Sequence, residues 1–139
     1  MADGEYKLPV PVADAESQEF YAGAKQHKLM LVRCAQCGSW RLPGRERCSD
    51  CWSTESTWAE ASGKGKLYTF GIMHQQYHPA FADAIPYNYA YVELDEGPRL
   101  ITNIVDCPNE ALRVDMPVEA VYDDVSAETT LVRFRPVGA

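Results

Sequence analysis

From residue 57 onward the pattern of apolar and polar residues is mostly that of β-strands, and the segment KLYTFGIMHQQYH (66–78) begins with the polar–apolar alternation that is typical of them. The segments YNYAYVELD (87–95) and RLITNIVDC (99–107) flank the turn DEGP (95–98) and therefore predict a hairpin. PNEALRVDM (108–116) predicts a short helical turn. Three further segments have strand character: 66–78, 117–124 and 129–137. Five short strands with a helical connection after the third predict a small closed barrel such as an OB-fold.

The pattern near the N-terminus is different and predicts a helix over residues 13–28. Asp14 or Ser17 can cap its start. Its apolar face is thin and depends mainly on Phe20 and Tyr21. Two interpretations remain open from the sequence: the helix packs lightly on its own chain, or it uses these two aromatic residues to dock on a partner.

Four of the five cysteines form two C-x2-C pairs that are ten residues apart: Cys34, Cys37, Cys48 and Cys51. Two thiolates from each tight turn complete a tetrahedron around one Zn²⁺. LMLVR (29–33) predicts a strand that enters the first pair, and Gly38 follows that pair at a position that often requires positive φ. A closed four-thiolate site leaves no position for substrate, so we expect a structural zinc. Iron, in a rubredoxin-like electron carrier, is the alternative.

These patterns predict a mainly β protein in three parts. Residues 1–28 form an extended arm and the N-terminal helix, residues 29–58 form a rubredoxin-like zinc ribbon, and residues 59–139 form a five-stranded OB-fold barrel.

Charge argues against one common function of zinc ribbons and OB-folds. The net charge is −7, and residues 59–139 alone carry twelve acidic and six basic side chains. Binding to a phosphate backbone requires clustered Lys and Arg, so we expect no nucleic-acid partner. Single-strand binding remains an alternative because six aromatic residues could stack on bases: Trp40, Trp52, Tyr68, Tyr87, Tyr89 and Tyr91.

Composition also bears on location. No apolar run approaches the roughly 20 residues of a membrane helix, and the acidic N-terminus does not resemble a secretory signal. An odd number of cysteines does not suit a disulfide framework. We therefore expect a cytoplasmic protein without a membrane partner.

No catalytic constellation is evident. His74 and His78 have helical ligand spacing, but Pro79 and the preceding strand favour a loop. Cys107 is left over from the metal set, and burial at a strand end is favoured over a reactive thiol. SGKGK (62–66) lacks the P-loop pattern. Its Lys64 and Lys66 could contact an anion, although a plain hinge between ribbon and barrel is favoured.

The order of several segments resembles the zinc-ribbon/OB-fold family associated with acyl-CoA enzymes, long described as a domain of unknown function. The resemblance covers nearly the whole chain and rests on these segments: EFYAGAKQHKL (19–29), RCAQCG (33–38), RCSDC (47–51), SGKGKLYTF (62–70), PYNYAYVELDEGPRL (86–100) and MPVEAVYDD (116–124). Asp115 is a departure, because the family usually has glycine there. Aspartate tolerates positive φ, so we expect the turn to be kept.

The resemblance implies a non-catalytic accessory subunit that forms a hetero-oligomer with a thiolase-like enzyme. An acyl-CoA hydratase, aldolase or acyltransferase is the alternative partner. It further implies that Cys34, Cys37, Cys48 and Cys51 bind zinc. Phe20 and Tyr21 would lie in the interface, and a CoA thioester would be shared with the partner.

Overall fold

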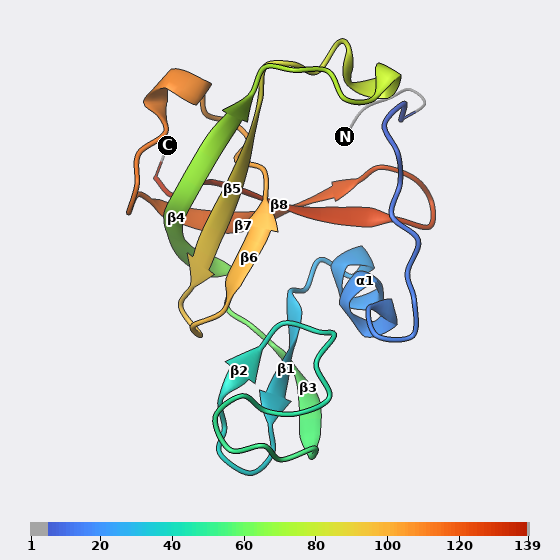
Figure 1. Ribbon diagram of the computed structural model, residues 1–139, viewed down its shortest axis with the longest axis vertical. Coiled ribbons are helices and arrows are strands. Elements are labelled where there is room, and N and C mark those ends of the chain that lie inside the picture. Colours follow the sequence, from blue (N-terminus) through green and yellow to red (C-terminus); the bar gives the residue numbers. More distant parts are fainter. Residues whose placement is uncertain (1–5, 139) are drawn as a thin grey trace.

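In the computed structural model, which describes residues 6–138, the strands form two sheets (Figure 1). The three-stranded sheet has the order β2-β1-β3, and its strands are β1 (Met30–Cys34), β2 (Trp40–Arg41) and β3 (Ser56–Glu60). The five-stranded sheet has the order β6-β5-β4-β7-β8, and its strands are β4 (Lys64–Met73), β5 (Tyr87–Leu94), β6 (Arg99–Thr102), β7 (Pro117–Asp124) and β8 (Thr130–Pro136). The predicted mainly β fold is confirmed.

The five-stranded sheet curls until its two edges meet. Ile104, just after β6, forms a parallel bridge to Phe134 of β8. The Val105 N–H donates to the Phe134 carbonyl at 2.8 Å, and the Phe134 N–H donates to the Asn103 carbonyl at 3.1 Å. The short 3-10 helix η2 (Asn109–Ala111) follows this closing segment, where a helical turn was predicted. The strand order, the closing contact between β6 and β8, and the short helix after β6 are those of the partly open Greek-key OB-fold barrel.

Two predicted strands were too long at their C-terminal ends. The chain leaves the sheet after Thr102, and Asp106 takes a left-handed conformation with φ 57°, so the strand predicted over 99–107 ends early. The strand predicted over 66–78 begins at Lys64 and ends at Met73. A loop follows and contains the 3-10 helix η1 (Pro79–Phe81).

The ribbon contains a strand that was not predicted. β3 pairs with β1 along its whole length, from Met30 opposite Glu60 to Cys34 opposite Ser56. Its sequence, STWAE, is short and half polar, and only this pairing makes it extended.

One hydrophobic core serves both sheets. Leu29 and Leu31, at the start of the ribbon, are fully buried among barrel residues that include Leu67, Val92 and Phe134. In Figure 1 the ribbon lies at one end of the molecule and α1 (Gln18–Lys25) lies beside its junction with the barrel. The ribbon is therefore anchored through β1.

Helix α1 is shorter than the helix predicted over 13–28. Asp14 holds the preceding turn, since its carboxylate accepts hydrogen bonds from the Ser17 N–H at 2.9 Å and the Ser17 hydroxyl at 2.8 Å. The helix ends where His27 takes φ 60° and the Lys28 N–H donates to the Gly23 carbonyl at 2.9 Å, a Schellman-type end. No helix within residues 6–138 is long and apolar enough to cross a membrane.

Candidate metal centre and docking faces

The two C-x2-C turns are built in the same way. The Gly38 N–H donates to the Cys34 carbonyl at 3.0 Å, and the Trp52 N–H donates to the Cys48 carbonyl at 2.9 Å. Gly38 has φ 80°, as predicted, and Trp52 has φ 66° at the equivalent position. Each turn therefore points its two cysteine side chains toward the other turn.

The four sulfur atoms converge and lie within 4.8 Å of one another. Cys34 Sγ is 3.5 Å from Cys51 Sγ, and Cys37 Sγ is 3.6 Å from Cys48 Sγ. A zinc tetrahedron with Zn–S bonds of about 2.3 Å has sulfur–sulfur distances of roughly 3.8 Å. The four cysteines are thus positioned to bind one metal ion, and the all-thiolate donor set suits Zn²⁺.

The surroundings of these cysteines affect their protonation. Hydrogen bonds, first from the Ser39 hydroxyl and then from backbone N–H groups of Cys51 and Asp50, lower the pKa of Cys48 to about 6. The Ser53 N–H lowers the pKa of Cys51, but burial and the neighbouring sulfurs outweigh it and raise that pKa to about 12. Four thiolates cannot share this space without a cation, so a bound metal resolves the opposition between the sulfurs.

Phe20 and Tyr21 lie where α1 meets the barrel. Their rings pack edge to face at 5.3 Å and line a groove together with Tyr89 and Ile101. Phe20 also packs against the core, and burial raises the pKa of Tyr21. Of the two open interpretations, the helix does pack on its own chain. Because Ile101 is 63% exposed, the outer part of the groove still offers an apolar surface. Docking on a partner through these residues stays a prediction.

Lys64 and Lys66 both lie on β4, but their surroundings differ. Lys66 Nζ lies 3.7 Å from Glu93 and 3.9 Å from Asp115, whereas Lys64 is exposed and forms no ion pair with a described residue. The Ser62 N–H of the same segment donates to the Glu96 carboxylate at 2.8 Å. Acidic groups therefore surround this turn, and an anion contact stays a prediction that fits Lys64 better than Lys66.

Three further residues singled out from the sequence make local contacts within the chain. His78 lies in the predicted loop, where its Nδ1 accepts a hydrogen bond from the Ala80 N–H at 3.0 Å. Cys107 is half-buried and packs against the core. Asp115 has φ 71° and its N–H donates to the Leu67 carbonyl at 2.7 Å, so the turn is kept. Within the described residues, the four cysteines are the one group of three or more His, Cys, Asp or Glu side chains placed to hold a metal.

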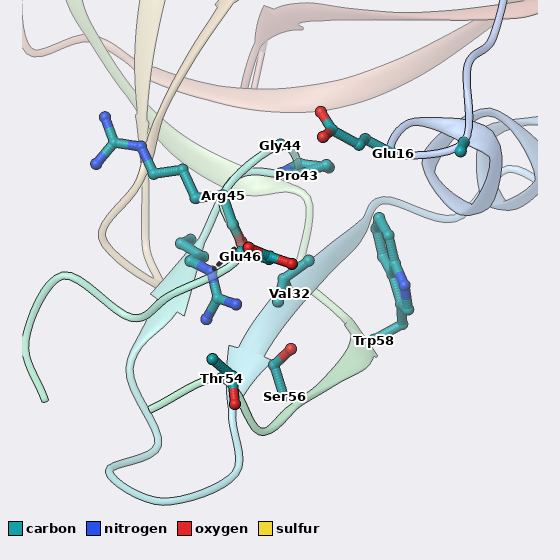
Figure 2. Close-up of a pocket in the computed structure, with 11 residues that line it drawn as sticks. Glu16, Val32, Pro43, Gly44, Arg45, Glu46, Thr54, Ser56 and Trp58 are labelled. Carbon is teal, nitrogen blue, oxygen red and sulfur yellow. Dashed lines mark hydrogen bonds between the residues drawn. The ribbon is translucent and has the colours of Figure 1, made fainter. Parts of the chain in front are cut away.

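A second groove, on the ribbon, was not predicted. Arg41 of β2 and Trp58 of β3 flank Val32 of the central strand, and these three side chains lie in one cross-strand row. The loop 43–46 and residues 15–16 form its walls (Figure 2). The available signal in the sequence was the concentration of four arginines in the ribbon segment: Arg33, Arg41, Arg45 and Arg47.

Comparisons with known proteins match two successive domains along the chain. Residues 22–57 match the ChsH2 rubredoxin-like zinc ribbon domain, and residues 58–123 match the ChsH2 C-terminal OB-fold domain. A "DUF35 domain-containing scaffold protein" of Methanocaldococcus jannaschii is 36% identical over 120 residues, which cover 81% of this chain and 84% of that protein.

Some relatives carry the names of enzyme subunits. The "Probable enoyl-CoA hydratase alpha subunit" of Thermomonospora curvata is 37% identical over 92% of this chain, and the chain spans 40% of that protein's length. The "Benzoylsuccinyl-CoA thiolase subunit BbsA" of Thauera aromatica is 30% identical over 70% of this chain and 65% of its own. A solved structure titled "Ltp2-ChsH2(DUF35) aldolase" contains a chain that is 37% identical with a TM-score of 0.80, over 91% of this chain and 98% of that one.

Proposed function

Because this chain belongs to the ChsH2-type DUF35 family, in which a rubredoxin-like zinc ribbon precedes an OB-fold domain, we propose that it is a non-catalytic accessory subunit of an acyl-CoA enzyme. The observation that carries the proposal is similarity across both domains to proteins named as parts of such enzymes.

The class of partner is a finer proposal. A thiolase was expected from the sequence, and the similarity to a thiolase subunit supports it. The similarity to a hydratase subunit and to the aldolase complex is higher in identity and supports those two classes at least as well. We therefore propose a hetero-oligomer with one of these acyl-CoA enzymes, in which the larger partner supplies the catalytic residues.

Zinc has a structural role in this proposal, with one ion per chain held by Cys34, Cys37, Cys48 and Cys51. These thiolates close the coordination shell and hold together turns that have little core of their own. A compartment that keeps thiols reduced fits this site, so we propose the cytoplasm.

For the partner we propose two contacts. Phe20 and Tyr21 would form part of the interface, together with the exposed Ile101 beside them. Lys64 would contact an anionic group of CoA, and Lys66 would contribute less because Glu93 and Asp115 already neutralise it. In the complex, Lys64→Gln is expected to raise KM for the CoA substrate more than Lys66→Gln does.

The proposal is tested by purifying the tagged full chain from its own host under native conditions. We expect one zinc per chain and a stoichiometric, larger acyl-CoA enzyme, whose identity decides among thiolase, hydratase and aldolase. A chain that elutes alone at every tag position, or a red iron-containing protein, would contradict the proposal. Tyr21→Ala should reduce recovery of the enzyme, whereas Tyr77→Ala, at a 75% exposed position in the loop after β4, should not.

A further inference from the structure

The ribbon holds arginine side chains that form no ion pair with any acidic residue in the described part of the chain. Within the described residues, the ion pairs of arginines are all on the barrel, between Arg99 and Glu93, Arg133 and Asp123, and Arg135 and Glu119. Among residues 6–138, none of the four arginines of the ribbon segment takes part in an ion pair. In a chain with a net charge of −7, the ribbon therefore gathers guanidinium groups that have no ion pair in the part of the chain that the structure describes.

Arg41 is the most constrained of the four. Its Nε donates to the Arg45 carbonyl at 3.2 Å. Its Nη1 is buried and has no hydrogen-bond partner among the described residues, the one buried side-chain nitrogen or oxygen there of which this is true. A buried donor without a partner costs free energy unless something else satisfies it. The guanidinium is therefore a site that lacks an acceptor.

The groove around Arg41 has the shape and lining of a receptor for a side chain. It is an open groove of about 290 Å³, lined by the apolar side chains of Val32 and Trp58 and, at one end, by the hydroxyl groups of Thr54 and Ser56 (Figure 2). A guanidinium beside an apolar surface suits a group that is anionic at its tip and aliphatic along its stem.

The acids of the groove indicate which anion this is. Glu16 and Glu46 both line it, and neither pairs with Arg41. These two carboxylates repel a phosphate dianion, which carries two negative charges, more strongly than they repel a carboxylate ligand, which carries one.

We propose that the groove formed by Arg41, Val32 and Trp58 is a docking site for an aspartate or glutamate side chain of the partner enzyme. The identity of the partner rests on the proposed function, whereas the carboxylate specificity of the groove rests on this chain alone.

The first test uses the purified, zinc-loaded full chain and N-acetylglutamate as the probe. Its titration is followed by NMR at the Arg41 side-chain N–H and the Trp58 indole N–H. Saturable shifts of both signals in the millimolar range are expected, at least threefold weaker with inorganic phosphate. Arg41→Gln should abolish the shift of the Trp58 signal, whereas Arg113→Gln, at an exposed position outside the groove, should leave both shifts unchanged. No shift at Arg41, or tighter binding of phosphate, overturns the carboxylate site.

The second test uses the complex. Arg41→Gln is expected to raise its Kd at least tenfold, Arg41→Lys by less, and Glu46→Gln to lower it, with zinc content equal in all variants. Arg113→Gln is the matched control. A complex that forms with unchanged affinity in Arg41→Gln overturns this inference and leaves the proposed function standing. If no partner is recovered at all, the proposed function fails and the titration still decides what the groove binds.

Discussion

Two glycines of β4 show how a single residue fixes the barrel. A Cβ at Gly65 would overlap the backbone carbonyl of Glu93 on β5, whereas a Cβ at Gly71 would overlap the ring and hydroxyl of Tyr89. Backbone in a paired strand cannot move without breaking the ladder, but an exposed tyrosine can turn away. The SGKGK segment therefore carries Gly65 for close approach of two strands and does not need an anion to explain it.

This difference predicts unequal effects. Gly65→Ala is expected to lower the free energy of unfolding by about 3 kcal/mol, and Gly71→Ala by less than about 1 kcal/mol, as measured by urea denaturation of the zinc-loaded chain. Equal decreases in the free energy of unfolding would mean that the paired strands can move apart at as little cost as the Tyr89 side chain can rotate away.

The left-handed backbone conformation strains Trp52 but not Gly38, because only glycine adopts it without cost. It has φ 66° at the position of the second metal turn that corresponds to Gly38 in the first, and it is 70% exposed. The left-handed conformation costs a side-chain-bearing residue about 1–2 kcal/mol, partly offset by the greater chain entropy of glycine. We expect Trp52→Gly to stabilise the ribbon by about 0.5 kcal/mol and Gly38→Ala to destabilise it by about 1 kcal/mol. The rate of zinc transfer to a chelator is the measurement, and faster transfer from Trp52→Gly would contradict it.

At the scale of elements, a polar cluster holds the end of α1 on β7. The His27 ring stacks on Tyr122 at 5.1 Å, and its Nε2 lies 3.1 Å from the Asp124 carboxylate. Asp124 also accepts a hydrogen bond from the Thr130 hydroxyl. The Thr130 hydroxyl first, and His27 second, hold the pKa of Asp124 below its ordinary value of 3.8.

A carboxyl group whose pKa is lower in the folded chain than in the unfolded chain stabilises the fold at pH values above its unfolded-state pKa. This stabilisation is lost as the pH falls through its folded-state pKa. Acidification below about pH 4 should therefore remove this contribution. Zinc also leaves in acid, so the quantity to measure is the difference in melting temperature between the chain and its Asp124→Asn variant. We expect this difference to be largest near neutral pH and to vanish at low pH. Asp83→Asn, at an exposed position in the loop after β4, should show no such difference.

Elements whose sequence carries their own signal could be predicted, and elements that depend on a distant partner could not. The strand over 117–124 was predicted with its observed bounds because its pattern and turn residues agree. β3 is extended because it pairs with β1, and its five residues, apolar and polar without regular alternation, do not predict a strand by themselves. The metal cysteines could be found by spacing alone. The Arg41 groove could not, because three separate strands assemble it.

At the scale of the whole molecule, the hydrophobic core stabilises the barrel, and the metal site stabilises most of the ribbon. The barrel supplies most of the shared core, and the ribbon contributes to it mainly through Leu29 and Leu31 of its first segment. Beyond them the ribbon depends on the metal site for its two turns and on short strand pairings. Loss of the metal should therefore not affect the two parts equally.

Removal of the metal by a chelator under reducing conditions is expected to unfold residues 33–58 and to leave β4 and β5 paired. Structural zinc sites contribute about 10–16 kcal/mol in isolated finger peptides, far more than the ribbon's other contacts can replace. Hydrogen exchange measures this directly, through loss of protection in the ribbon and its retention in the barrel. Cys37→Ser should reproduce the effect, and Cys107→Ser, outside the sulfur cluster, should not. Simultaneous loss of protection throughout the chain would mean that Leu29 and Leu31 couple both parts into one cooperative unit.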